Sequence, residues 1–292
     1  MIYQNLVQLV GNTPVVLFEG LYLKLEYYNP TGSVKDRPML YMIKDLEERG
    51  IIQKGDTLVE ATSGNMGIAM AFLASVLGYK AILVMPESMS VERIRLMEAY
   101  GAKVILTSAT GGMKESIQKA KEMATLPGHH YLDQFNNSQN VNAHKLTTAQ
   151  EILKDFDELD FIISGIGTSG TITGLGEVLK QHYPNLKMIG VEPKESAVLT
   201  TNTPGRHRIQ GIGAGFVPPL LNHDIVDWIE VVASDEAISE MGKLWKKGLY
   251  VGISSACAVI AGRRILEKYP DAKILVIIPD HGFKYMSVVT HD

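Results

Sequence analysis

The sequence predicts an α/β protein built from two three-layer α/β domains, each with a mainly parallel sheet. Short apolar runs rich in β-branched residues alternate with longer stretches of helical periodicity along most of the 292 residues. Alternation of this kind places helices on both faces of a parallel sheet. It breaks over residues 127–142, which are dense in Asn, Gln and His, and we interpret the break as a crossing between two domains.

The individual elements follow from the periodicity. Buried strands are predicted at residues 57–60, 81–85, 103–106, 161–164, 188–192 and 274–279. Helices are predicted at residues 66–77, 91–100, 113–124, 144–156 and 174–181. A second irregular stretch, residues 200–219, is rich in Gly and Pro, and irregular stretches of this length within compact domains are often functional.

Composition and charge argue against several classes of protein. The formal net charge of −4 gives no electrostatic support for binding nucleic acid. No apolar run approaches the roughly 20 residues that a membrane span needs, and residues 1–10 lack the pattern of a secretory signal. Cys257 is the only cysteine, which excludes an intrachain disulfide and a cysteine-based zinc site. We therefore expect a cytoplasmic protein with no metal, no membrane and no nucleic-acid partner.

The first candidate site is the segment 29–37, Asn-Pro-Thr-Gly-Ser-Val-Lys-Asp-Arg. Its turn signals predict a helix that begins around Ser33, with Lys35 in the first turn. The helix dipole disfavours a positive charge there, and a neutral lysine amine can form an imine. Taken alone, however, the segment fits a solvated surface lysine better, because most lysines are exposed.

The second segment, 60–67, follows a strand and opens a helix. Thr62 and Ser63 are natural N-cap residues, and free N–H groups at such a helix start can bind an anion. Capping needs one hydroxyl, whereas the six residues 62–67 have three polar side chains and two glycines. It therefore favours a site for a carboxylate or a phosphate.

The third segment, Ser164-Gly-Ile-Gly-Thr-Ser-Gly-Thr171, again joins a strand to a helix. Its glycines allow close approach of the backbone and its hydroxyls add donors, which is typical of a phosphate cradle. The segment also matches G-x-G-x-x-G, with Glu192 at a spacing suited to a ribose, so an NAD-dependent dehydrogenase is an alternative. The position of the motif in mid-chain and the successive hydroxyls favour a terminal phosphate. Two weaker segments are the glycine-rich loop 207–215 and the helix start at Ser254, which could be a plain connection and a cap.

Together these segments resemble the cysteine synthase (O-acetylserine sulfhydrylase) family, which belongs to the fold-type II, tryptophan synthase β-like enzymes that use pyridoxal 5′-phosphate. The motifs Gly11 to Pro14, Lys24 to Glu26, Gln134-Phe135 and Gln210 to Gly215 also carry the resemblance, which covers nearly the whole chain. It implies that Lys35 is the catalytic, Schiff-base lysine. It implies these cofactor-binding residues besides Lys35: Asn65, Gly167, Thr168, Ser169, Gly170, Thr171 and Ser254. It implies these substrate-binding residues: Thr62, Ser63, Gly64, Met66, Gln134, Gly211 and Gly213.

The resemblance also implies where the cofactor lies and what the enzyme does. Pyridoxal phosphate is expected in a cleft between a larger phosphate-binding domain, residues 1–34 and 138–292, and a smaller mobile substrate-loop domain, residues 35–137. The expected reaction is β-replacement, in which O-acetylserine and sulfide give cysteine and acetate through an aminoacrylate intermediate. Lys35 would remove the α-proton, and Ser254 would face the pyridine nitrogen with a neutral hydroxyl. A homodimer is expected, and the C-terminal tail of serine acetyltransferase is a further candidate partner.

Several positions depart from the family pattern. Met66 stands where the family has a threonine beside the substrate carboxylate, and Ala256, Cys257 and His281 also differ. An alternative function is therefore release of hydrogen sulfide from cysteine, giving serine, lanthionine or pyruvate. Met66 could favour this function by contacting a sulfur-containing substrate, or it could simply pack beneath its loop. A dehydrogenase would have no use for Lys35, and a purely regulatory protein would have no use for Lys35, Asn65 and Ser254. These residues therefore argue against both alternatives.

Overall fold

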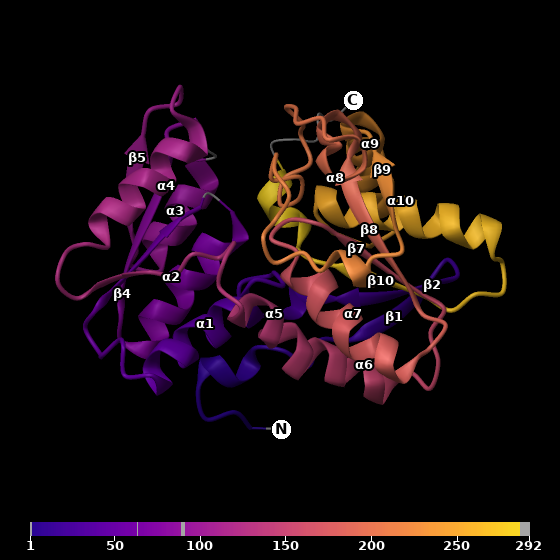
Figure 1. Cartoon of the computed structure of the whole chain (residues 1–292), viewed down its shortest axis with the longest axis horizontal. Helices are drawn as coiled ribbons and strands as arrows, with labels where there is room; N and C mark the ends of the chain where they lie inside the picture. The colour runs from indigo at the N-terminus through magenta and orange to yellow at the C-terminus, as the bar shows by residue number, and fades with distance from the viewer. Residues whose placement is uncertain (1, 63, 89–90, 287–292) are drawn as a thin grey trace. The chain divides into compact units, whose positions relative to one another are not determined.

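The computed structural model describes residues 2–62, 64–88 and 91–286 (Figure 1). The chain forms two compact units: unit 1 comprises Met1–Val10 and Lys35–Asn140, and unit 2 comprises Gly11–Val34 and Val141–Asp292. Residues 1–10 and 138–140, which the sequence assigned to the larger domain, thus group with unit 1. Val7 and Val10 pack against the core of unit 1, and the Gln139 side chain donates a hydrogen bond to Asp45 there.

Unit 1 is a three-layer sandwich around a four-stranded parallel sheet. The strand order is β5 (Lys103–Thr107), β4 (Lys80–Pro86), β3 (Thr57–Ala61) and β6 (His129–Tyr131). One face packs against α1 (Asp36–Glu48), α2 (Asn65–Leu77) and α3 (Val91–Ala99), and the other face packs against α4 (Gly112–Met123). The alternation of side chains along β3 supplies both cores, since Leu58 joins the first and Val59 the second.

Unit 2 is a larger three-layer sandwich around a six-stranded sheet. The strand order is β1 (Val15–Phe18), β2 (Leu21–Leu25), β10 (Ile274–Ile278), β7 (Phe161–Gly165), β8 (Lys187–Pro193) and β9 (Trp228–Val232). Only the β1–β2 pair is antiparallel among the described strands of this sheet. The helices α9 (Ser234–Lys246) and α10 (Ile253–Lys268) cover one face, and α6 (Ala149–Asp155) and α7 (Gly170–His182) cover the other.

Short helical segments complete the described part of the chain. They are Leu6–Leu9, Glu26–Tyr28, α5 (Gln139–Ala143), the π-helix His144–Thr148, Lys194–Ser196, α8 (Val198–Thr201), His223–Ile225 and Gly282–Tyr285. The predicted helix at residues 144–156 is thus a π-turn followed by α6. After α8, residues 202–219 contain neither helix nor strand, in agreement with the predicted irregular stretch.

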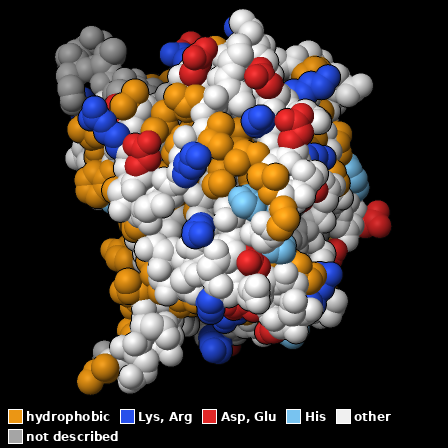
Figure 2. Space-filling view, turned by 90° about the vertical axis from the view of Figure 1, so that its left-hand side faces the viewer, with side chains coloured by type: hydrophobic (Ala, Val, Ile, Leu, Met, Phe, Trp, Pro, Cys, Tyr) orange, Lys and Arg blue, Asp and Glu red, His pale blue; other side chains and the backbone are white. Residues whose placement is uncertain are grey.

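The predicted fold class, α/β with mainly parallel sheets, is confirmed. Each of the six predicted strands overlaps an observed strand, whereas β1, β2, β6 and β9 were not predicted. None of the helices described in the structure is long and apolar enough to cross a membrane. On the face shown in Figure 2, Lys and Arg side chains are interspersed with Asp and Glu, as the small net charge suggests.

Candidate functional site

The predicted site residues fall into two groups, one in each unit, and each group is described within its own unit. Unit 1 contains Lys35, the loop between β3 and α2, and Gln134; Ser63 lies outside the described residues. Unit 2 contains the segment 167–171, the glycine loop with Gly211 and Gly213, and Ser254.

Lys35 is half-buried and forms the N-cap of α1, with φ −73° and ψ −13°. The sequence predicted a helix start around Ser33, but the helix begins at Asp36. Within unit 2, Ser33 pairs with Asp280 in an isolated bridge, and the Val34 N–H donates a 2.8 Å hydrogen bond to the Pro279 carbonyl. These contacts hold the two residues in strand-like pairing with the segment after β10, which delays the start of the helix.

The loop after β3 places Gly64 as the N-cap of α2, in extended conformation and without a side-chain cap. The Thr62 hydroxyl accepts a 3.3 Å hydrogen bond from the Gly64 N–H, so Thr62 lies two residues before the cap position. Plain capping by Thr62, the alternative to an anion site, is therefore not what the structure shows. Since no described side chain occupies the cap position, the first turn of α2 can direct N–H groups at an anion.

Met66 lies in the first turn of α2, and its side chain is 2% exposed within the apolar core of unit 1. This burial favours packing over contact with a substrate. Two other departures from the family pattern, Ala256 and Cys257, are fully buried in the core of unit 2. Burial raises the pKa of the Cys257 thiol, which makes this group unreactive.

His281 belongs to an aromatic cluster in unit 2. Its ring centroid lies 4.1 Å from that of Phe283, 5.3 Å from Tyr27 and 5.2 Å from Tyr250. Burial lowers the pKa of His281, and the nearby Lys284 acts in the same direction. We assign His281 a packing role, as the neutral member of this cluster.

The candidate phosphate cradle lies in unit 2, where β7 leads into α7. Ser169 is the N-cap and has a left-handed backbone with φ 66°, and its hydroxyl donates a 2.6 Å hydrogen bond to the Thr168 carbonyl. The helix begins at Gly170, four residues before the predicted start at 174. A left-handed conformation is uncommon for a serine and is often found at functional sites.

The glycine loop lies directly against this cradle. A Cβ atom on Gly167 would lie 2.5 Å from the carbonyl oxygen of Gly211, so a side chain at this position would force the two loops apart. The Gly213 N–H donates a 3.0 Å hydrogen bond to the Ile166 carbonyl, and His207 Nε2 lies 2.9 Å from the Gly213 oxygen. The loop that contains residues 207–215 is thereby fixed to the turn after β7.

Ser254 joins the same region of unit 2. It lies in the first turn of α10 and is 3% exposed, and its hydroxyl makes no hydrogen bond to other residues that the structure describes. A Cβ atom on Gly211 would lie 3.8 Å from the Ser254 oxygen. Unit 2 therefore brings together three residues that are far apart in the sequence, Gly167, Gly211 and Ser254.

His144 is a residue of this region that the sequence analysis missed. It is buried in the π-helix, where Nδ1 lies 2.9 Å from the Thr148 hydroxyl and Nε2 lies 3.2 Å from the Thr171 hydroxyl. If Nε2 carries the hydrogen and donates to the Thr171 oxygen, the Thr171 hydrogen is left for a ligand. The segment His144–Thr148 mixes polar and apolar residues, so no clear signal in the sequence marked His144.

Glu192 does not fit the dehydrogenase alternative. Its carboxylate is 2% exposed and accepts hydrogen bonds from the Leu199 N–H (2.9 Å), the Thr200 N–H (3.0 Å) and the Thr200 hydroxyl (2.6 Å). Through these hydrogen bonds the Glu192 carboxylate holds the start of α8 in place. A carboxylate engaged in this way is not available to bind a ribose.

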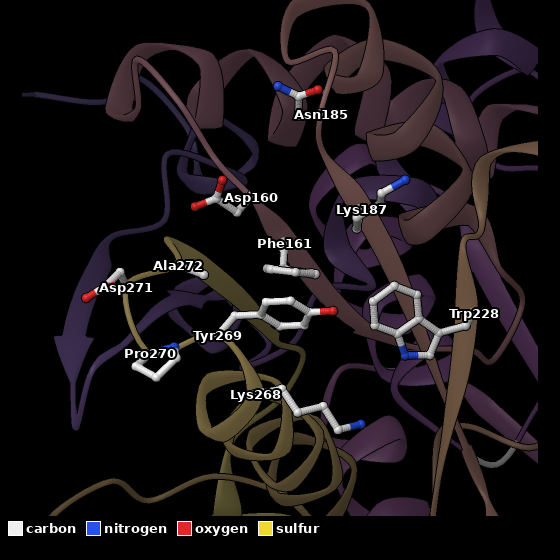
Figure 3. A pocket seen from close by; sticks show the side chains of 10 residues that line it. All are labelled: Asp160, Phe161, Asn185, Lys187, Trp228, Lys268, Tyr269, Pro270, Asp271 and Ala272. Atoms are coloured by element: carbon white, nitrogen blue, oxygen red, sulfur yellow. The ribbon is translucent and has the colours of Figure 1, made fainter.

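Unit 2 also contains a cavity of about 630 Å³, whose lining residues are shown in Figure 3. Phe161, Lys187 and Trp228, at the starts of β7, β8 and β9, line it together with Lys268 and Tyr269 at the end of α10. The candidate phosphate cradle follows the carboxyl end of β7. Because ligands of open parallel sheets bind at the carboxyl ends of the strands, this cavity at the opposite edge is not the candidate site.

The residues present fit pyridoxal phosphate in both units. In unit 2, the cradle at the start of α7 suits a phosphate, and a Cβ on Gly167 would fill it. The buried, neutral hydroxyl of Ser254 suits a ring nitrogen. Unit 1 offers a half-buried lysine that suits an aldehyde.

Comparisons with known proteins agree with this fit. The family model described as pyridoxal-phosphate dependent enzyme matches residues 6–280. A cysteine synthase of Staphylococcus aureus is 43% identical over 295 residues, covering 97% of this chain and 95% of that protein. The crystal structure of a cysteine synthase from Entamoeba histolytica aligns with TM-score 0.95 and 37% identity, covering 100% of this chain and 93% of the other. A hydrogen sulfide-producing enzyme from Fusobacterium nucleatum aligns with TM-score 0.93 and 39% identity, covering 98% and 100%.

Proposed function

Since this chain belongs to the pyridoxal-phosphate dependent enzymes of the cysteine synthase family, we propose that it is a cysteine synthase that converts O-acetylserine and sulfide to cysteine and acetate. The observation that carries this proposal is the likeness to a cysteine synthase along almost the whole of both chains. The neutral hydroxyl of Ser254 is consistent with it. A neutral partner for the ring nitrogen limits carbanion build-up and so favours loss of a β-substituent over racemisation.

The residues of each unit have defined roles in this proposal. When bound, pyridoxal phosphate supplies an electron sink for the electrons left by loss of the substrate α-proton. Lys35 would hold the cofactor covalently, and its amine would accept the α-proton. The backbone N–H groups of residues 167–171 would hold the phosphate, and Asn65 would bind the 3′-oxygen of the ring.

The remaining residues would bind the substrate. Thr62, Ser63 and Gly64, with the first turn of α2 and Gln134, would bind the carboxylate of O-acetylserine. Gly211 and Gly213 would shape the pocket around the substrate side chain. We propose that the larger domain binds the phosphate and that the smaller, mobile domain binds the substrate.

Product analysis tests the proposed function directly. Purified protein given O-acetylserine and sulfide should form cysteine and acetate, and the same protein given cysteine alone should release sulfide much more slowly. Faster sulfide release from cysteine than cysteine formation would contradict the proposal and favour the hydrogen sulfide-producing alternative.

Met66 provides a test of substrate preference. Because its side chain is buried in the core of unit 1, we expect Met66→Thr to lower the free energy of unfolding by roughly 1–3 kcal/mol. The ratio of kcat/KM for O-acetylserine to that for cysteine should stay unchanged. Met70→Thr, one turn further along α2 and also buried, is the matched control and should lose similar stability. A rise in the ratio for Met66→Thr alone would instead assign Met66 a role in substrate preference.

Family membership also suggests the setting in which the enzyme works. We propose a cytoplasmic homodimer that can bind the C-terminal tail of serine acetyltransferase at its active site. Light scattering on the purified protein tests the dimer, and competition between a tail peptide and O-acetylserine tests the partner.

A further inference from the structure

His144 is a fully buried polar side chain of unit 2 that has no role yet in the proposed function. It opens the π-helix His144–Thr148, and π-helical turns occur often at functional sites. This turn packs closely against α7, since a Cβ atom on Gly174 would lie 2.8 Å from the Cβ of His144. An ion pair between Lys145 and Glu177 joins the same two elements. These contacts hold the His144 ring beside the first turn of α7.

Both ring nitrogens of His144 contact the hydroxyl group of a buried threonine. Nδ1 lies 2.9 Å from the Thr148 oxygen, and Nε2 lies 3.2 Å from the Thr171 oxygen. Among the residues that the structure describes, each hydroxyl has His144 as its one hydrogen-bond partner. The three side chains therefore form a chain of hydrogen bonds that runs from Thr148 through His144 to Thr171.

The burial of Thr148 determines the direction of this chain. A hydroxyl hydrogen buried without an acceptor is costly, and Nδ1 of His144 is the acceptor within reach. Thr148 therefore donates to Nδ1, which carries no hydrogen. The hydrogen of the imidazole is then on Nε2, which donates to the Thr171 oxygen. Since the Thr171 hydrogen meets no acceptor within the described part of the chain, it is left for a ligand.

We propose that His144 is a positioning residue that orients the Thr171 hydroxyl, so that its hydrogen points at the phosphate of the cofactor. This inference rests on the proposed function, in which residues 167–171 hold that phosphate. Thr171 is the second residue of α7, where the helix N-terminus favours an anion. All the donors of the chain point the same way, and each hydrogen bond polarises the next. The chain thereby strengthens the hydrogen bond from Thr171 to the phosphate.

The test is a double-mutant cycle that measures the dissociation constant of pyridoxal phosphate by equilibrium dialysis. His144→Leu combined with Thr148→Val removes the chain without leaving a buried hydroxyl unpaired at position 148, and should raise the constant roughly three- to tenfold. Thr171→Val removes a hydrogen bond to a charged group and should raise it about tenfold or more. Because His144 acts through Thr171, adding the first pair of substitutions to Thr171→Val should change the constant little.

Two further variants control for damage to the fold, which thermal unfolding measures in each protein. In His144→Gln the side-chain amide keeps an N–H donor near the position of Nε2, so the affinity should stay within about twofold of the wild type. Thr147→Val removes a hydroxyl of the same π-helix that donates to the Ala143 carbonyl and lies outside the chain, so the affinity should not change. Additive effects in the cycle, or an equal loss of affinity in His144→Gln and the leucine variant, would overturn the inference.

A measurement on the unmodified chain removes the dependence on folded variants. NMR of the protein labelled with ¹⁵N-histidine shows which ring nitrogen carries the hydrogen, and the spectrum of His144→Gln assigns the signal. A hydrogen on Nδ1 of His144 would overturn the inference alone. The expected binding pattern in a protein that forms no cysteine would overturn the proposed function alone, and a wild type that does not bind pyridoxal phosphate would overturn both.

Discussion

Lys35→Ala is expected to abolish both the yellow colour and the activity of the purified protein. The substitution removes the amine that would bind the cofactor aldehyde and accept the α-proton, so turnover should fall on the order of a thousandfold or more. The fold should persist, because Lys35 is a half-buried N-cap without a side-chain capping bond. Visible absorption measures the covalent link, and circular dichroism measures the fold.

Lys44→Ala is the matched control for this experiment. Lys44 lies in the same helix, α1, on its exposed face, and exposed substitutions of this kind usually change stability by less than about 0.5 kcal/mol. The control should keep colour and activity. A colourless wild type that cannot be reconstituted with pyridoxal phosphate, or a Lys35→Ala protein that keeps the visible band, would contradict the assignment of Lys35.

Gly167→Val is expected to cause the largest loss of cofactor affinity without touching the covalent link. Because a Cβ at this position would lie 2.5 Å from the Gly211 carbonyl oxygen, valine must displace the glycine loop or the cradle. Loss of two hydrogen bonds to the phosphate, each about 1.5 kcal/mol, would weaken binding roughly a hundredfold. Equilibrium dialysis of pyridoxal phosphate measures the effect.

A glycine in open surroundings provides the control for this variant. Gly242 lies in α9, and a Cβ there meets nothing within 4 Å among the described atoms. Gly242→Val should retain the cofactor like the wild type. Wild-type affinity in Gly167→Val would show that the turn after β7 does not bind the phosphate.

The long, strongly patterned elements could be predicted from the sequence, and the short or exposed ones could not. Strands such as β3 and β4 are runs of buried apolar residues in the middle of a parallel sheet, and periodicity identifies them directly. By contrast, β1 is a four-residue edge strand with exposed residues, and β6 is His-His-Tyr, which has no strand signature. Pairing with neighbours distant in the sequence determines such strands.

The candidate site shows the same division. The segment 164–171 could be predicted as a phosphate cradle because its glycines and hydroxyls lie together in the sequence. Other contacts join residues that are distant in the sequence. Gly167 and Gly211 are 44 residues apart, and Thr171 and His144 are 27 residues apart.

The place of β10 in the sheet of unit 2 has a consequence for how the chain folds as it is made. This strand lies between β2 and β7, and Val276 pairs with Leu23. The sheet of unit 2 therefore lacks an inner strand until residues 274–278 have been synthesised. Unit 1, whose segment Lys35–Asn140 is continuous, can form its own sheet earlier. Nascent chains paused before residue 274 should thus resist proteases over unit 1 while β2 remains open to cleavage and to chaperones.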